Sequence, residues 1–410
     1  MLKQLLVYSE LRGSPTLCGL LTNVGEASQQ PNRRRSVFEY VGSWLKRSDA
    51  YPLDPRRLPL STGRFPSGDD EQVHGIFRDA APDSWGQRVI DKAYPDFKFG
   101  HMDYLAATDS YRAGDLSFGR LPKEGPISLL PNGHPIPPAP PASDLRKLLQ
   151  VAELIEANEP LPDDLRMLLQ QGQSLGGARP KASFRDDEGV LWVAKFPARD
   201  DTFNMAAAEA ACLDMAEACG IQVPERRVVL VGTAPVLLLK RFDREIDNDK
   251  EYRLGYMSAA TALGVPEIFY SRLSYADLAV EARWLGDLPG VKELFKRMLL
   301  DVAVGNIDNH LRNHAFLRKR DGQWCLSPAF DITPVGRPGT NLALQISERQ
   351  ALPDLTAAVG AHARFGIDKE DADRILKATI EVTSQWPVYM KKRGIIEAEL
   401  PQIAPSFSLV

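Results

Sequence analysis

Cysteine and histidine are scarce in this sequence, and neither residue is grouped. The six histidines form no H-E-x-x-H motif, and the four cysteines form no C-x-x-C pair. These absences argue against a zinc ribbon and against a disulfide framework. We therefore interpret the cysteines as reduced residues of the protein core. They are Cys18, Cys212, Cys219 and Cys325.

The sequence also lacks an excess of charge of either sign and any long apolar run. In 410 residues, 50 Lys and Arg stand against 54 Asp and Glu, for a net charge of −4. This balance excludes a protein that coats nucleic acid through general positive charge, although it leaves open a local basic patch. No apolar run approaches the roughly eighteen residues of a membrane span, and charge interrupts the N-terminal residues too early for a signal peptide. We expect a cytoplasmic protein with no membrane partner.

Proline marks the clearest change of composition along the chain. Eight of the 31 prolines lie between Leu121 and Pro141. Because proline fixes φ and has no backbone N–H, we interpret this stretch as a linker or a long ordered loop. The apolar content of the whole chain, 44%, is typical of a globular protein. We expect an N-terminal domain over residues 1–121, a strand-containing lobe over 122–242 and a helical lobe over 243–410.

Hydrophobic periodicity and turn residues predict the local structure. Strand-like pieces recur between residues 173 and 242, and helices dominate from about Glu267 onward, which predicts two lobes with a cleft between them. The predicted strands are 3–8, 37–40, 182–184, 190–196 and a hairpin of 227–231 with 235–240. The predicted helices are 85–93, 143–171 with a break at 160–162, 203–219 and 291–302. Asp83 or Ser84 would be the N-cap of the first of these helices.

A glycine-rich segment runs from Gly172 to Lys181 and contains the adjacent Gly176 and Gly177. Glycine lets backbone N–H groups approach a ligand that side chains would exclude, and a run of such groups binds anions. The segment is not a Walker A loop, because G-x-x-x-x-G-K-[ST] is absent. Taken alone, a flexible turn is an equally good interpretation.

Lys195 closes the predicted strand at 190–196, and Glu209 follows fourteen residues later on the predicted helix at 203–219. A strand lysine paired with a helix glutamate holds the α- and β-phosphates of ATP in protein kinases. The ordinary interpretation is a solvated strand end and a solvent-facing glutamate. The interpretation of Lys195 and Glu209 as an ATP-binding pair therefore depends on the motifs that accompany them.

The most specific pattern follows the apolar stripe at 291–302. Asp308 precedes Asn313 by five residues, and Asp331 comes eighteen residues after Asn313. Residues 314–318 and 323–326 flank a turn and predict a hairpin between them. Phosphoryl transfer needs an acid that accepts the hydroxyl proton and oxygen ligands for Mg²⁺. The spacing and the order of the elements are those of a kinase fold.

In these motifs the sequence resembles the HipA family of serine/threonine kinases, the toxins of bacterial toxin–antitoxin pairs. The resemblance covers nearly the whole chain and implies an α+β, bilobal protein-kinase-like fold, with a strand-containing N-terminal lobe and an all-helical C-terminal lobe. It rests on Ser174–Lys181, Val193–Pro197, Lys240–Arg244, Asp308–Asn313 and Phe330–Pro334, and upstream on Tyr51–Leu60, Phe77–Gly86 and Asp109–Phe118.

The resemblance implies ATP and Mg²⁺ as cofactors and assigns roles to single residues. Asp308 would be the catalytic base, Asn313 and Asp331 would hold Mg²⁺, and Glu209 would pair with Lys195. Ser174 would be the site of autophosphorylation, where a phosphate would add nearly two negative charges beside those of ATP. The residues that would contact ATP are Gly176, Gly177, Ala178, Arg179, Lys181, Lys195, Lys240, Arg241, Phe242, His310, Asn313, Phe330 and Asp331.

The sequence departs from the family pattern at three places. The hinge begins with Lys240 where the family often has Glu, which matters little if the backbone recognises adenine. Arg179 and Pro180 stand where some members have Gln-Glu, which could change the mobility of the glycine-rich loop. There is no D-F-G, but Phe330-Asp331-Ile-Thr-Pro334 fits the family's own form.

The resemblance also implies partners. These are a HipB-like helix-turn-helix antitoxin, operator DNA reached mainly through that antitoxin, and a protein substrate such as an aminoacyl-tRNA synthetase. Two other functions stay open: a small-molecule phosphotransferase and a catalytically silent regulatory protein with a kinase fold. The presence of Lys195, Asp308, Asn313 and Asp331 argues against the silent protein. The N-terminal 120 residues and the Ser174 segment argue against the small-molecule enzyme.

Overall fold

The computed structural model describes residues 2–24, 35–68, 71–108, 111–127, 144–162, 165, 179–348 and 350–410. The chain forms two compact units, and each is built from separate stretches of sequence. The first unit contains Met1–Ala198, Asp243–Met257 and Leu317–Gly322, and the second contains Arg199–Phe242, Ser258–Phe316 and Gln323–Val410. Most of the predicted linker and most of the glycine-rich segment lie outside the described residues.

A five-stranded antiparallel sheet forms the beginning of the first unit, in the order β4-β3-β2-β1-β5. Val7 on β1 pairs with Gly19 on β2 and with Phe118 on β5. Phe77 packs on this sheet, with its ring centroid 5.3 Å from that of Phe38 and 6.2 Å from that of Phe118. The strands are β1 (Gln4–Ser9), β2 (Thr16–Val24), β3 (Arg35–Tyr40), β4 (Phe65–Pro66) and β5 (Leu116–Gly119).

Short helices pack on this sheet and beside it. α4 contacts β1 and β5, and α5 contacts α3. The Asp83 Oδ1 atom accepts the Gly86 N–H at 2.9 Å, which confirms the predicted helix start. The helices of the first unit are α1 (Gly42–Leu45), α2 (Gly75–Asp79), α3 (Ser84–Ala93), α4 (His101–Ala107) and α5 (Leu145–Glu156).

Two hairpins complete the described part of the first unit. β6 (Lys181–Arg185) pairs antiparallel with β7 (Leu191–Lys195), as the sequence predicts. Asp186 holds the turn between them, because its carboxylate accepts the Trp192 Nε1–H at 2.7 Å and the Val190 N–H at 2.8 Å. β10 (Arg244–Asp247) pairs with β11 (Lys250–Arg253). Asn248 and Asp249 turn this second hairpin with φ of 50° and 59°, values that Asn and Asp tolerate better than most residues.

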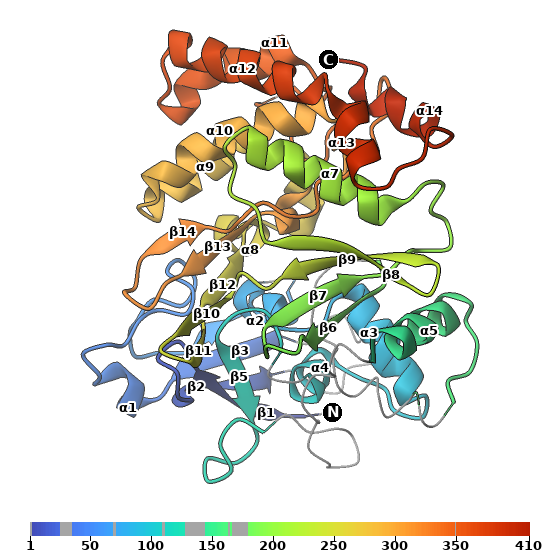
Figure 1. Cartoon of the computed structure of the whole chain (residues 1–410). Helices are drawn as coiled ribbons and strands as arrows, with labels where there is room; N and C mark the ends of the chain where they lie inside the picture. The colour runs from blue at the N-terminus through green and yellow to red at the C-terminus, as the bar shows by residue number, and fades with distance from the viewer. Residues whose placement is uncertain are drawn as a thin grey trace. The chain divides into compact units, whose positions relative to one another are not determined.

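A buried helix organises the core of the second unit. α7 (Met205–Ala218) is rich in alanine, and nine of its fourteen residues are buried. It contacts the hairpin of β8 (Arg226–Val231) and β9 (Ala234–Lys240) on one side and α13 on another (Figure 1). Gly220, with φ of 70°, lets the chain leave the helix, which confirms the predicted stop. Small alanine side chains allow this close packing against several neighbours.

The rest of the second unit is mainly helical, around the long α10. α10 contacts α9, α11 and α12 (Figure 1). Its apolar stripe, including Val291, Leu294, Phe295 and Met298, is fully buried, which confirms the predicted helix. The helices are α8 (Ala259–Leu263), η3 (Glu267–Arg272), α9 (Tyr275–Trp284), α10 (Leu288–Ala303), η4 (Leu311–Asn313), α11 (Leu355–Gly360), η5 (His362–Phe365), α12 (Lys369–Thr383), α13 (Trp386–Lys392), α14 (Leu400–Ile403) and η6 (Ala404–Phe407).

The expectation of an all-helical part after residue 242 needs correction. Besides β10 and β11, it contains β12 (Gly255–Ser258), β13 (Ala315–Arg318) and β14 (Trp324–Leu326). The Ser327 N–H donates to the Ala315 carbonyl at 2.8 Å, and Gly322 has a φ of 93° in the turn between β13 and β14. This is the hairpin predicted between Asn313 and Asp331. Among the helices that the structure describes, none is long and apolar enough to cross a membrane.

Candidate active site

A tight polar loop follows α10 and carries the predicted catalytic residues. Asp308 lies in the turn of this loop with its side chain exposed. The Asp308 carbonyl accepts the His310 N–H at 2.9 Å and the Asn313 Nδ2–H at 3.4 Å. The Asn313 N–H donates in turn to the His310 carbonyl at 2.9 Å. The loop therefore holds Asp308, His310 and Asn313 together and leaves the Asp308 carboxylate open to solvent.

A buried polar cluster beneath the loop fixes its path. Asp301 on α10 accepts hydrogen bonds from Asn306 Nδ2 and Asn309 Nδ2, each at 2.7 Å, and from the Tyr275 hydroxyl. Asn309 Nδ2 also lies 3.1 Å from His314 Nε2. All five side chains are buried, so every one of these hydrogen bonds is shielded from water.

Sequence reasoning missed this cluster. Its signal was available, because Asp301 interrupts the apolar run Leu299, Leu300, Val302 at a position that faces the core. A buried acid in an apolar stripe needs several hydrogen-bond donors. Tyr275 comes from α9, far from Asp301 in the sequence, and could not be identified as a donor from local patterns.

Burial shifts the titration of two groups in the cluster. Burial raises the pKa of Asp301 to about 6, against the opposing effect of its hydrogen bonds from Tyr275 and Asn306. Burial lowers the pKa of His314 well below its ordinary value, and the nearby charge of Arg297 acts in the same direction. His314 is therefore held as a neutral imidazole, in which Nε2 can accept from Asn309.

The segment that carries Phe330 and Asp331 contacts the same loop. The Thr333 N–H donates to Asn306 Oδ1 at 3.3 Å. Gly336 packs so closely on Gly305 that a Cβ at residue 336 would lie 2.6 Å from the Gly305 carbonyl oxygen. Asp331 itself has a φ of 57°, in the left-handed region that non-glycine residues adopt rarely and that clusters at functional sites. The two predicted acidic segments are thus joined inside the second unit.

The predicted hinge also reaches this region. The rings of Phe242 and Phe330 lie with centroids 5.4 Å apart and planes at 32°. Lys240 uses its N–H within the hairpin, donating to the Glu225 carbonyl at 2.9 Å, and its Nζ lies 3.4 Å from the Glu225 carboxylate. Arg241 is buried. Any adenine contact in this segment must therefore use backbone groups other than the Lys240 N–H.

Two residues of the second unit, Asn313 and Asp331, have side chains whose chemistry fits a magnesium ion. Asn313 and Asp331 offer oxygen atoms, the ligands that Mg²⁺ prefers, and the hydrogen bond from Asn313 Nδ2 to the Asp308 carbonyl leaves Oδ1 of Asn313 as the acceptor. Within the described ranges, no group of three or more His, Cys, Asp or Glu forms a metal cage. Mg²⁺ commonly takes one or two protein oxygens and completes its shell with water and phosphate oxygens.

Two further predicted residues form a pair within the first unit. Lys181 on β6 and Lys195 on β7 are direct cross-strand partners. Directly opposite residues project from the same face, and two like charges there repel each other, so the pair favours an anion beside it. The Lys181 side chain is only 6% exposed. The glycine-loop residues Ser174, Gly176, Gly177 and Ala178 lie outside the described residues.

Glu209 is buried on α7, with 5% of its surface exposed. The ordinary interpretation of a solvent-facing helix glutamate is therefore wrong for this residue. A buried carboxylate requires a compensating partner, which agrees with a specific role. The pairing of Glu209 with Lys195 stays a prediction.

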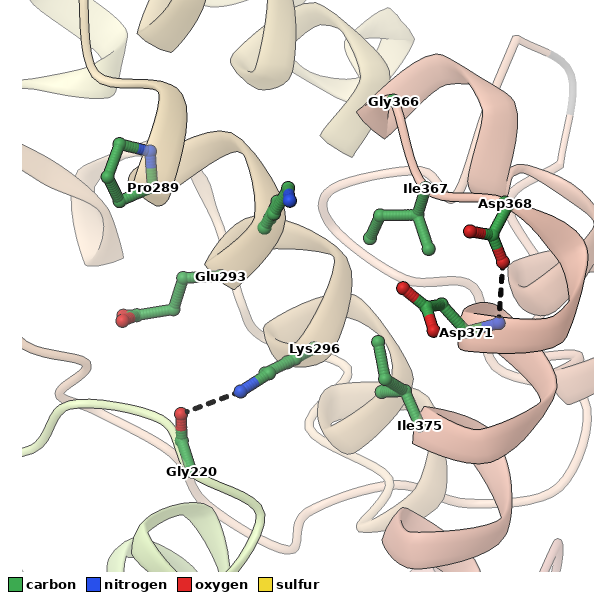
Figure 2. Close-up of a pocket in the computed structure, with 10 residues that line it drawn as sticks. Gly220, Pro289, Glu293, Lys296, Gly366, Ile367, Asp368, Asp371 and Ile375 are labelled. Carbon is green, nitrogen blue, oxygen red and sulfur yellow. Dashed lines mark hydrogen bonds between the residues drawn. The ribbon is translucent and has the colours of Figure 1, made fainter.

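A pocket of about 320 Å³ lies elsewhere in the second unit, between α10 and the start of α12 (Figure 2). Its lining includes none of the predicted site residues. Lys296 donates to the Gly220 carbonyl at 3.1 Å, Asp368 accepts the Asp371 N–H at 2.8 Å, and Glu293 pairs with Arg297 (Figure 2 shows the first two). Because these polar groups are satisfied within the protein, we assign no ligand to this pocket.

Comparisons with known proteins identify the family of the chain and its fold. A family model described as the HipA-like C-terminal domain matches residues 173–386, and one described as the HipA N-terminal domain matches residues 21–119. The chain is similar in structure to the HipA, HipB and operator DNA complex of the Shewanella oneidensis MR-1 toxin–antitoxin system, with a TM-score of 0.66 and 16% identity over 98% of this chain and 95% of that chain. At this identity, the likeness establishes a shared fold. The proinflammatory kinase CtkA of Helicobacter pylori gives a TM-score of only 0.35, with 15% identity over 57% of this chain and 92% of that chain.

Proposed function

The chain belongs to the HipA family, and on that premise we propose that it is an ATP-dependent protein serine/threonine kinase that acts as the toxin of a toxin–antitoxin pair. Its α+β fold is the one seen in the Shewanella oneidensis HipA complex. The contacts of the candidate site support the proposed kinase reaction.

The observation that carries the proposal is the junction of the two acidic segments through Asn306. This side chain bonds to Asp301 below the Asp308 loop and to the Thr333 backbone beside Asp331. Asp308, exposed in its turn, would orient a substrate hydroxyl and accept its proton. Asn313 and Asp331 would hold Mg²⁺, which would neutralise charge on the phosphates. A proton acceptor and Mg²⁺ ligands on two connected segments are what phosphoryl transfer requires.

The lysine pair of the first unit is a second observation that supports the same proposal. Lys181 and Lys195 are cross-strand partners, and the triphosphate of ATP supplies the negative charge that such a pair favours. Phe242 and Phe330, whose rings are 5.4 Å apart, would contact the adenine with the backbone around Arg241. The roles of Arg179 and His310 at the nucleotide stay predictions.

We further propose the partners that the family suggests. The similar Shewanella structure contains HipB and operator DNA, and we propose that this chain likewise binds a HipB-like helix-turn-helix antitoxin, with operator DNA reached mainly through that partner. The proposed substrate class is a translation component such as an aminoacyl-tRNA synthetase. Ser174 is the proposed site of autophosphorylation. Co-purification with the product of a neighbouring gene would test the antitoxin, and its absence would count against it.

The reaction can be tested directly with the purified chain. Radiolabelled ATP and Mg²⁺ should label the protein or a cell extract, and phosphopeptide mass spectrometry should find phosphate on Ser174. Asp308→Ala should abolish labelling while the circular dichroism spectrum is unchanged. If this variant still transfers phosphate, the assignment of Asp308 is wrong. ATP binding without transfer to any acceptor would favour a silent regulatory protein, and transfer only to small molecules would favour the small-molecule phosphotransferase.

A further inference from the structure

The start of α3 contacts a lysine of the proposed nucleotide site. The Asp83 Oδ2 atom lies 3.9 Å from Lys181 Nζ. The Trp85 Nε1–H donates to the Lys181 carbonyl at 3.2 Å. Asp83 and Trp85 belong to the Phe77–Gly86 motif of the N-terminal domain, and 96 residues of sequence separate Trp85 from Lys181. One short segment thus holds both the side chain and the backbone of this lysine.

These contacts are shielded from solvent. The side chains of Lys181 and Asp83 are only 6% and 14% exposed, and Trp85 is buried. Charges attract each other more strongly in such an environment than at an open surface. Asp83 is itself fixed, because its second oxygen caps α3 by accepting the Gly86 N–H at 2.9 Å. α5 contacts both α3 and β6, which joins these elements further.

The lysine has a reason to need such a partner. Lys195 stands directly opposite Lys181 across the β6–β7 hairpin, so the two ammonium groups repel each other. Lys is a flexible point charge with a long side chain, and without a fixed anion it would turn toward solvent. The Asp83 carboxylate supplies that anion from the N-terminal domain whether or not a phosphate is present.

We infer that Asp83 and Trp85 are positioning residues for Lys181, through which the N-terminal domain sets the orientation of a lysine that binds the ATP phosphates. This inference rests on the proposed function for the role of the phosphates. The contact between the motif and Lys181 stands independently of it. The Phe77–Gly86 motif then contributes to the kinase reaction as well as to the stability of its own domain.

The contact can be tested without turnover. A neighbouring carboxylate favours the protonated, unreactive form of an amine. Asp83→Asn keeps the shape and the helix cap but removes the charge. Brief treatment with acetic anhydride and peptide mass spectrometry should show Lys181 acetylated about three- to tenfold faster in this variant, relative to the exposed Lys377. Asp91→Asn, on the same helix, should leave the rate unchanged, and equal melting temperatures would exclude unfolding.

The role is tested by a double-mutant cycle on phosphate transfer. Asp83→Asn should slow transfer by about tenfold or more, because a misplaced lysine misaligns the phosphates. In a Lys181→Ala background, Asp83→Asn should have no further effect. Adenosine affinity, which does not involve the phosphates, should stay within about twofold. Trp85→Phe keeps the ring and loses the N–H donor, and should cause a smaller decrease.

Each outcome is decisive. An unchanged acetylation rate of Lys181 in Asp83→Asn overturns the inference. So does an equal loss of transfer in the presence and absence of Lys181, since Asp83 would then act elsewhere. If the unmodified protein transfers no phosphate at all, the proposed function fails, and the acetylation result still decides whether Asp83 controls Lys181.

Discussion

Asn306 joins the two acidic segments of the candidate site through a single side chain. Its Nδ2 atom donates to Asp301 at 2.7 Å, and its Oδ1 atom accepts the Thr333 N–H at 3.3 Å. The first bond fixes the loop that carries Asp308, and the second fixes the segment that carries Asp331. Since Asn306 is buried, neither bond can be replaced easily by water.

Asn306→Ala should therefore lower stability and disturb the site together. It removes one of the donors to the buried Asp301 carboxylate and leaves the Thr333 N–H without its partner. We expect the free energy of unfolding to fall by about 1–3 kcal/mol, measured by urea denaturation. Asn341→Ala, at an exposed position of the same unit, is the matched control and should stay close to the unmodified protein. Equal urea denaturation curves for the two variants would show that the Asn306 hydrogen bonds do not contribute to stability.

Asp308→Asn should affect the reaction and not the fold. The side chain is exposed and only its backbone carbonyl is used by the loop, so the melting temperature should be unchanged. Loss of the proton acceptor should slow phosphate transfer by about 10²–10⁴-fold. Glu370→Gln removes an exposed acid from α12 and should have no effect on the rate. Retention of full activity by Asp308→Asn would assign the base to another group.

His314 should make the protein sensitive to acid. Its pKa is lowered by burial in the folded protein, whereas the unfolded chain binds a proton near pH 6.5. Below that pH the unfolded state binds more protons, so stability present above pH 6.5 is lost as the pH falls, by up to about 1.4 kcal/mol per pH unit. His314→Gln should flatten this slope in denaturation curves at pH 7 and pH 5. A slope as steep as before would place the sensitivity in other groups.

The pH dependence of stability that Asp301 contributes should have the opposite sign to that of His314. The pKa of Asp301 is raised to about 6, above the ordinary 3.8 of the unfolded chain. Its contribution to stability is fully present below the unfolded value and is lost as the pH rises through about 6. As the pH falls from 6 to 4, the free energy of unfolding of the unmodified protein should therefore rise by on the order of 2 kcal/mol relative to that of Asp301→Asn. Paired denaturation curves measure this difference, and parallel curves across the range would contradict a raised pKa.

Gly336→Ala should separate the two acidic segments by steric force. The added Cβ would lie 2.6 Å from the Gly305 carbonyl oxygen, which belongs to rigid backbone. Such overpacking costs about 1–3 kcal/mol and should reduce phosphate transfer as well. Gly360→Ala is the matched control, because nothing lies within 4 Å of its Cβ position. If both variants melt at the same temperature, the close approach of Gly336 to Gly305 is unimportant.

Several elements could be predicted from local sequence. Asp83 caps α3, the stripe of Val291, Leu294 and Met298 forms α10, and the β6–β7, β8–β9 and β13–β14 hairpins form where turn residues predict them. Helix periodicity, capping and turn chemistry act over a few residues, so they can be recognised without knowing the fold. Apart from the predicted β13–β14 hairpin, the strands after residue 242 (β10, β11 and β12) were missed, because each has only four residues and carries little periodic signal.

By itself, the sequence determined the local elements, the HipA-type motifs and the identity of the residues that could carry phosphoryl transfer. Only the tertiary structure decided that Asp301 and Tyr275 support the Asp308 loop, that Asn306 joins it to Thr333, and that Asp83 lies beside Lys181. These pairs are separated by 26 residues in the first case, 27 in the second and 98 in the third. Contacts of that range arise from the packing of whole elements around shared cores, and no short pattern in the chain encodes them.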